Sequence, residues 1–398
     1  MNLEYQSVPN ERRKEFYDLL HYAFRPEEGH AEFDPEAIPG EVGARRGLFD
    51  GEELAVVCRH YWFDARVRGT WLSAPGLSAV ASPPEHRHKG YIRQLLEESL
   101  REYRDRGSML SLLWPFKYAF YHKYGWDTCS RFSRITVEPG HLDFTADTVE
   151  GEFRQASADD WETLDEIYTV DAGNEDLALE RTENWWRHRI FEGWDKDPFV
   201  YLWETDNEPR GYVIYTVEAD TEEDGKTLDV REVAAVDESA YRNGLRFAYA
   251  HEAQVERVRI HGSPEATLLD RLPQQWDADC KLSRGPMARI VDVPNAIEAL
   301  EYPPDLNGSV RIGVDDPLVD WNDNTFEVSF VDGSASCHQV NGDPDVTFSM
   351  AALSQLYVGY RSLERLRRET AVTVHDDNAG NLLDRAFPSR MGYLREGF

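Results

Sequence analysis

"PPEHRHKGYIRQLLEESLREYRDRG", residues 83–107, places a basic turn directly before a predicted helix. Three cations, Arg87, His88 and Lys89, precede Gly90, and apolar side chains then recur at helical spacing. Unpaired N–H groups and the helix dipole make a helix N-terminus an anion site, and a glycine there lets a phosphate approach the backbone. Cations at this end oppose the dipole, so a solvated basic cluster explains them poorly. The stretch therefore predicts a pyrophosphate-binding loop.

The neighbouring sequence predicts helices and strands in a mixed α/β order. A helix is expected over residues 11–23, a hairpin turn at 50–51, a buried strand within 108–114, a short helix within 116–126 and another strand over 131–140. The basic turn and its helix make one crossover in the middle of this order.

The length of 398 residues exceeds one ordinary core, and three units in close contact are expected. Residues 1–145 form the first. Residues 146–290 repeat its element order, but the turn at 236–238 has neither a basic cluster nor a glycine, which predicts a duplicated fold that lost its ligand loop. Residues 291–398 read as strands, then one amphipathic helix over 350–368, then a polar tail.

The acidic composition indicates a salt-rich cellular environment, and it does not indicate a cationic substrate. The formal net charge is -31, and only seven of the 43 basic residues are lysine. Excess carboxylate suits a salt-rich cytoplasm, so we expect a cytoplasmic protein of a halophile that binds neither nucleic acid nor membrane.

No apolar run has the length of a membrane span, and the N-terminus lacks a signal peptide's apolar core. No metal is expected: His86 and His88 have no third ligand nearby, and no metal or redox spacing joins the cysteines, Cys58, Cys129, Cys280 and Cys337.

The loop resembles that of a known family. "VASPPEHRHKGYIRQLL" (80–96) is similar to the acetyl-CoA loop of GNAT acetyltransferases, R/Q-x-x-G-x-G/A, with Ile92 in place of the final small residue. It resembles more closely the P-E-x-R-x-K-G loop of the Eis (enhanced intracellular survival) acetyltransferases, as do "LLWPFKYAFYHKYGW" (112–126) and the paired units. "LSQLYVGYRSLERL" (353–366) is similar to sterol carrier proteins. The resemblance implies an α/β (α+β) fold, with tandem GNAT folds followed by a sterol-carrier-protein-like α+β domain.

The same resemblance implies acetyl-CoA as co-substrate. It assigns the pantetheine arm to the backbone of the strand before the loop, and the pyrophosphate to the loop amides and basic side chains. The implied cofactor-binding residues are Val80, Ser82, Arg87, His88, Lys89, Gly90, Tyr91 and Ile92.

Acetyl transfer needs a neutral amine, a donor for the oxyanion and a proton for the departing thiolate. Tyr118, Tyr121 and Tyr124 lie in one aromatic stretch, where core packing is the alternative role. The resemblance implies Tyr121 as general acid, with Tyr118 in reserve. It also implies that the chain's last carboxylate, on Phe398 and near Glu396, is the general base, whereas a free terminus would otherwise be expected to fray.

The sequence thus predicts an acetyl-CoA-dependent N-acetyltransferase. The acceptor is an amine of a small molecule or a protein lysine, and the sequence does not choose between them. The alternative is a non-catalytic protein that binds acyl-CoA or lipid, or senses acetyl-CoA. The resemblance also implies a homo-oligomer, with the hexamer as the family's form.

Overall fold

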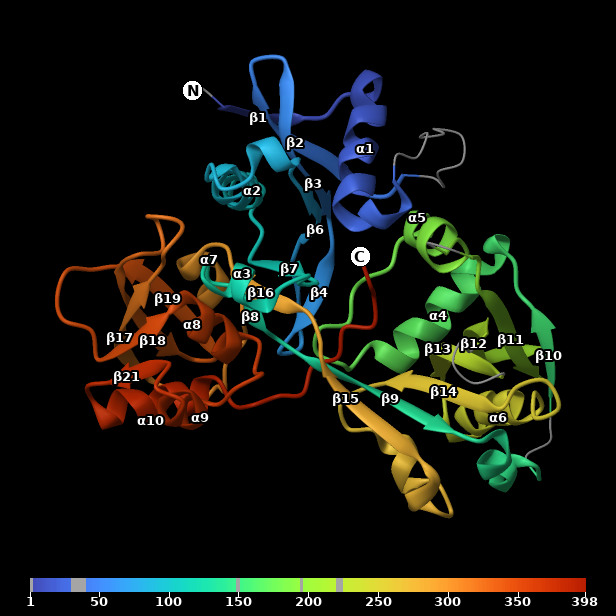
Figure 1. Ribbon diagram of the computed structural model, residues 1–398. Helices are drawn as coiled ribbons and strands as arrows, with labels where there is room; N and C mark the ends of the chain where they lie inside the picture. Colours follow the sequence, from blue (N-terminus) through green and yellow to red (C-terminus); the bar gives the residue numbers. More distant parts are fainter. Residues whose placement is uncertain (1–2, 30–40, 148–150, 194–195, 220–224) are drawn as a thin grey trace.

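The computed structural model describes residues 3–29, 41–147, 151–193, 196–219 and 225–398. They form two seven-stranded sheets, a five-stranded sheet and a hairpin of β4 (Asp64–Val67) and β5 (Thr70–Ser73). Figure 1 shows the C-terminus near the middle of the molecule, where the blue, green and red parts of the chain meet. Among the described helices, none has the length and apolar character needed to cross a membrane. The mixed α/β fold expected from the sequence is confirmed.

The first sheet has the order β1-β2-β3-β6-β7-β16-β8. Its amphipathic helix α2 (Tyr91–Asp105) buries Leu95, Leu96, Leu100 and Tyr103, as the helical spacing predicts. The strands are β1 (Leu3–Ser7), β2 (Ala44–Asp50), β3 (Glu53–Tyr61), β6 (Gly76–Ala81), β7 (Leu110–Leu113), β16 (Met287–Ile290) and β8 (Asp127–Thr128). The other helices are η1 (Asn10–Arg12), α1 (Arg13–Phe24), η2 (Pro26–Glu28), η3 (Pro84–His86) and α3 (Tyr118–His122).

The second sheet has the order β10-β11-β12-β13-β14-β9-β15. Its strands are β10 (Glu152–Gln155), β11 (Phe199–Thr205), β12 (Glu208–Ala219), β13 (Lys226–Ala235), β14 (Arg257–Gly262), β9 (Arg131–Val137) and β15 (Asp279–Arg284). Its helices are η4 (Pro139–Thr145), η5 (Ala158–Asp160), α4 (Trp161–Ala172), α5 (Glu183–Trp185), η6 (Trp186–Ile190), α6 (Glu238–Tyr249), η7 (Thr267–Asp270) and η8 (Gln275–Asp277).

The two large sheets exchange strands. β9, which the sequence assigns to the first unit, pairs with β14 and β15 in the second sheet. β16 returns to the first sheet beside β7 and β8. These pairings join segments far apart in the chain, so local patterns did not reveal them. The unit boundaries at residues 145 and 290 stay a prediction.

The third sheet has the order β19-β18-β17-β20-β21. The single helix expected over 350–368 is wrong: the chain breaks at Gly359, whose φ is +83°, and a serine caps each resulting helix, Ser349 for α8 and Ser362 for α9. The polar tail is also wrong, because α10 buries Leu383 against the core. The elements are α7 (Val293–Glu298), β17 (Gly308–Asp315), β18 (Thr325–Val331), β19 (Ser334–Gln339), β20 (Val346–Ser349), α8 (Met350–Tyr357), α9 (Leu363–Arg368), β21 (Val372–Val374) and α10 (Asp377–Ala386).

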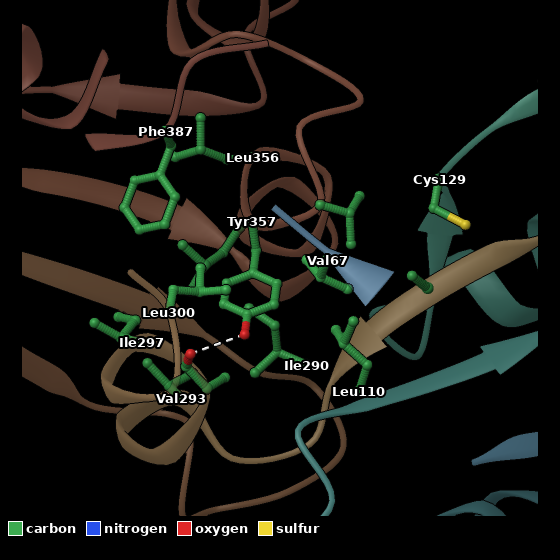
Figure 2. Packing of buried hydrophobic residues seen from close by; sticks show 14 of the residues in the cluster. Val67, Leu110, Cys129, Ile290, Val293, Ile297, Leu300, Leu356, Tyr357 and Phe387 are labelled. Carbon is green, nitrogen blue, oxygen red and sulfur yellow. Dashed lines mark hydrogen bonds between the residues drawn. The ribbon is translucent and has the colours of Figure 1, made fainter. Parts of the chain in front are cut away.

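One hydrophobic cluster joins the first sheet to the third unit (Figure 2). Leu110 and Ile290 of the first sheet pack in the same cluster as Tyr357, whose hydroxyl donates to the Ala296 carbonyl at 2.8 Å. The buried guanidinium of Arg68 donates to the carbonyl of Tyr357 at 2.7 Å. The third unit is therefore fixed on the first, and the last residues of the chain start from a defined point.

Candidate active site

Strands β6 and β7 run parallel but separate almost at once. Within the described residues they pair only at Gly76 with Leu112, and the Leu112 amide also donates to the carbonyl of Pro75 at 2.9 Å. β6 continues to Ala81 without a further pair to β7. An extended ligand can add to such an open strand edge through backbone hydrogen bonds.

β6 carries a bulge in its pairing with β3, within the stretch that no longer pairs with β7. One residue of β3, Cys58, lies opposite both Ala79 and Val80, and Ala79 has a φ of +53°. A bulge bends its strand and redirects the backbone groups near it. Of the expected pantetheine contacts, Val80 is one of the two bulged residues, and Ser82 lies just beyond the end of the strand.

The predicted anion loop has an open helix start. Gly90 is the N-cap of α2 with a φ of +84°, and His88 has a φ of +61°. α2 has no side-chain cap and no acidic residue in its first turn, and a Cβ on Gly90 would meet nothing within 4 Å. Tyr91 is buried and Ile92 packs on the core, so these two offer the ligand backbone groups. The N–H groups of this turn fit the pyrophosphate of acetyl-CoA.

The loop's cations remain available to an anion. The side chains of Arg87, His88 and Lys89 are exposed. Arg87 stacks over the Tyr22 ring at 5.6 Å, and Lys89 Nζ lies 3.5 Å from His86 Nδ1. Within the described part of the chain, no carboxylate pairs with Arg87 or Lys89.

His86 does not belong to this exposed group. It is buried, and its Nε2 lies 2.9 Å from Glu53 Oε1 on β3. The histidine therefore ties the loop to the sheet. Sequence reasoning missed this role, because nothing local links positions 53 and 86.

Tyr121 is a buried tyrosine on α3. Its ring packs edge-on against Phe116 and Phe120, and it shares a hydrophobic cluster with Val80 on β6 and Leu113 on β7. Burial raises the pKa of its phenol, with a smaller contribution from Cys58. The hydroxyl therefore keeps its proton at neutral pH, as a proton donor must.

Tyr118, the reserve candidate, has its hydroxyl engaged. It donates to Asp127 Oδ1 at 2.8 Å and lies 3.2 Å from His122 Nδ1. Burial and the Asp127 carboxylate raise the pKa of this phenol too. The prior hydrogen bond makes Tyr118 the poorer donor to a ligand.

Phe398, the last residue, lies against the first sheet. Its ring centroid is 5.0 Å from Phe63 and 5.7 Å from Tyr61. A Cβ added to Gly76 would lie 2.7 Å from Phe398 Cε2. The chain thus ends at the point where β6 and β7 separate.

Two side chains hold the backbone just before Phe398. Trp114 Nε1 donates to the Glu396 carbonyl, and Arg189 Nη2 donates to the Gly397 carbonyl, each at 2.9 Å. Trp114 follows β7, whereas Arg189 belongs to the second unit. These anchors were not found from the sequence, because they act across hundreds of residues.

A cavity of about 340 Å³ lies beside this tail. Trp114, Trp185, Arg189, Glu396 and Gly397 are among its lining residues. The cavity has the volume of a small-ligand site.

In the second unit, α6 begins at the position that corresponds to the start of α2, but the side chain of Asp237 caps its N-terminus. β13 and β14 run parallel and pair over only four positions, from Thr227 to Val230. The Asp237 carboxylate then caps α6, accepting from the Ala240 amide at 2.8 Å and from Arg210. The Asp237 carboxylate therefore bonds the N-terminus of α6, whereas the N-terminal N–H groups of α2 have no side-chain cap. Aspartate is a preferred N-cap residue, so Asp237 directly before the helix is the local signal for this cap.

Family models match all three units. The description "Acetyltransferase (GNAT) domain" matches residues 4–129 and again residues 177–290, and "Sterol carrier protein domain" matches residues 293–395. The N-acetyltransferase Eis of Mycobacterium tuberculosis is 25% identical over 372 residues, which is 88% of this chain and 87% of that protein. The chain is a homologue of the Eis N-acetyltransferases, with two GNAT acetyltransferase domains followed by a sterol carrier protein domain. The named relatives and the GNAT domain matches support an acyltransferase enzyme over the non-catalytic alternative.

Other relatives and solved structures agree with this assignment. An uncharacterized N-acetyltransferase of Streptomyces griseus is 24% identical over 347 residues and covers 82% of each chain. A GCN5-related N-acetyltransferase from Anabaena variabilis superimposes with a TM-score of 0.85 at 20% identity, covering all of both chains. Eis1 from Mycobacterium abscessus superimposes with a TM-score of 0.78 at 20% identity, also over both full chains. The two structures show that this Eis homologue shares their fold.

Proposed function

We propose that this protein transfers an acetyl group from acetyl-CoA to an amine held beside its C-terminus. The observation that carries the proposal is the contact of Phe398 with Gly76, where β6 and β7 diverge. The open edge of β6 leads from this point toward the α2 helix start. A cofactor with its pyrophosphate at Gly90 and its arm along β6 would direct its thioester toward the chain terminus.

Two groups of this chain move protons in the proposed reaction. The amine nitrogen attacks the thioester carbonyl, and the Phe398 carboxylate takes the proton that the nitrogen loses as the C–N bond forms. Tyr121 gives its phenolic proton to the sulfur as the C–S bond breaks, and its raised pKa keeps that proton in place beforehand. Acetyl-CoA and the amine become an amide and free CoA, and solvent returns the proton from the carboxylate to the phenol.

The cavity beside the tail favours a small-molecule amine as acceptor. Its volume of about 340 Å³ suits a compact ligand, and Trp114 and Trp185 supply apolar walls. A protein lysine is the second candidate, because a long unbranched side chain can also enter a cavity.

The test is thiol release with acetyl-CoA and a panel of amines, with each product identified by mass. The panel contains diamines, amino sugars and a lysine peptide. We expect acetylated small amines and stoichiometric CoA. Tight acetyl-CoA binding with no acetylated product from any amine would instead support an acetyl-CoA sensor.

A further inference from the structure

Arg181 is a fully buried cation that joins the second unit to the tail. Its Nε donates to Glu396 Oε1 at 2.7 Å, and its Nη1 and Nη2 donate to Glu232 at 3.1 and 2.8 Å. The side chains of Arg181 and Glu396 are each 1% exposed. The guanidinium also lies 3.8 Å over the Tyr168 ring, and the Tyr168 hydroxyl is shared between the Leu179 carbonyl at 2.9 Å and Glu396 Oε1 at 3.2 Å.

Such a network is unusual near a chain end. Terminal residues are commonly poorly ordered, and burying a charged pair costs desolvation free energy that its attraction repays only with good geometry. Burial opposes ionisation of Glu232, yet the charges of Arg181 and Arg395 hold its pKa below the usual value. Glu232 thus stays charged beside Arg181, and the network fixes the position of the tail.

A second branch holds the same tail from the other side. Arg395 Nη1 lies 2.7 Å from Asp171, and its Nη2 donates to Glu175 at 3.0 Å. The Tyr393 amide donates to the Asp176 carbonyl at 2.9 Å. All three partners belong to the second unit, near the end of α4 or just after it.

We propose that Arg181 is a positioning residue, which acts through Glu396 to hold the Phe398 carboxylate at the acetyl-transfer site. This inference rests on the proposed role of that carboxylate as base. Two residues span at most about 7 Å, so fixing Glu396 confines the terminal carboxylate to a small volume. The second unit, whose own helix start is closed by Asp237, would then serve the first unit's chemistry as the seat of the tail.

The test compares Glu396→Ala with Glu396→Gln in the full-length protein. The alanine removes both hydrogen bonds to the Glu396 carboxylate but leaves Arg181 paired with Glu232, so the fold is retained. We expect kcat to fall roughly tenfold or more, since small misplacements of a catalytic group are costly. The acetyl-CoA Kd should be unchanged, and amide exchange over residues 393–398 should quicken. The glutamine keeps the acceptor oxygen and should restore most of the activity. Glu183→Ala is the matched control, because this acid of the second unit bonds Arg187 and lies outside the cavity lining.

The same change in a chain extended by two glycines after Phe398 separates positioning from general stability. If Glu396 acts through the terminal carboxylate, Glu396→Ala adds no further loss once that carboxylate is displaced. An equal loss in both backgrounds, or normal kcat in Glu396→Ala, would overturn the proposal. If the extension alone leaves kcat unchanged, the terminal base is wrong. If Glu396→Ala then still lowers kcat in the unextended chain, Glu396 does not act through that carboxylate.

Should Glu396→Ala fail to fold, Tyr168→Phe provides a second variant. It removes the hydroxyl that donates to Glu396 and keeps the ring beneath Arg181. The expected result is a smaller loss of kcat with the same pattern of exchange in the tail. If amide exchange over residues 393–398 and kcat are both unchanged in this variant, the result would contradict the proposal that the second unit positions the chain terminus.

Discussion

The ring of Phe398 lies directly against the α-carbon of Gly76, the residue at which β6 and β7 make their parallel pair. The glycine has no side chain, so the terminal ring can occupy the junction of the two strands. Phe63 closes the same space from the other side, because its Cε2 would also lie 2.7 Å from a Cβ at Gly76. The end of the chain and the point where β6 and β7 separate are therefore one packed unit.

Gly76→Ala is expected to displace the chain terminus. The new methyl group must push away Phe398 or Phe63, and the last residue of the chain is the easier to move. We expect kcat to fall at least tenfold, as for other small misplacements, with the acetyl-CoA Kd changed little. Gly262→Ala is the control: it substitutes a glycine at the end of β14, where the nearest atom to an added Cβ is 3.5 Å away. Equal kcat values in the two variants would contradict the packing argument.

Extending the chain beyond Phe398 tests the base directly. The extension replaces the terminal carboxylate with a neutral peptide carbonyl and moves the charge elsewhere. Turnover should fall by roughly two orders of magnitude, the usual scale for losing a general base. Acetyl-CoA affinity, measured by calorimetry, should stay the same because the loop at Gly90 is a separate contact.

Tyr121→Phe removes only a hydroxyl and should also lower kcat while sparing cofactor binding. Combined with the extension, the loss should be less than the product of the two single losses, because both groups serve one transition state. Steady-state kinetics of the four proteins gives the comparison. Full activity of Tyr121→Phe would move the acid role elsewhere, with Tyr118 as the next residue to substitute.

The loop variants Arg87→Ala and Gly90→Asp should weaken acetyl-CoA binding without unfolding the protein. Arg87 supplies an exposed charge that no carboxylate of the described residues pairs, and an aspartate at Gly90 would add strain at a φ of +84° and a negative charge at the helix start. Arg101→Ala is a control on the same helix, where the side chain bonds Glu97. Calorimetry showing wild-type affinity in both loop variants would refute the anion site.

The sequence predicts the anion loop because the chemistry of that loop is local. Arg87, Lys89 and Gly90 are near neighbours in the chain, and the helix rule that gives them meaning depends only on the residues beside them. Arg181 and Glu396 are separated by 215 positions, and their importance depends on burial that no local pattern reports.

The errors at element level have similar physical causes. Apolar residues recur on both sides of Gly359, and Leu356, Leu363 and Leu366 are all buried. Periodicity therefore could not distinguish one helix from two, although the glycine itself was a signal. The exchange of β9 and β16 between sheets depends on pairing partners more than a hundred residues away, which a reading along the chain does not supply.

The charge of -31 predicts a protein that needs salt. At 1 M salt the Debye length is about 3 Å, so repulsion among surface carboxylates is largely screened. We expect the Tm to rise with KCl, and to rise more than in a nonionic osmolyte of equal osmolality.

Light scattering in molar salt should give a homo-oligomer, with a hexamer as the expected form. A monomer under these conditions would contradict the assembly prediction.

The Asp237 cap predicts one acetyl-CoA per chain. The carboxylate occupies the α6 helix start, where a second pyrophosphate would have to bind, and it is held by Arg210 and the Ala240 amide. Calorimetric titration should give a stoichiometry of one, and a value of two would refute the closed second site.

The same cap gives a pH dependence with a definite sign. The hydrogen bond from Arg210, followed by that from the Ala240 amide, lowers the pKa of Asp237. An acid whose pKa is lower in the folded state stabilises the fold above its unfolded pKa of about 3.9 and loses that contribution as the pH falls through the folded value. Asp237→Asn lacks this contribution. The wild-type Tm should exceed the variant's by a constant amount near neutral pH, and the difference should shrink as the pH drops below about 4. Melting curves of both proteins at fixed high salt provide the measurement, and a difference that grows toward acid would contradict the assigned direction.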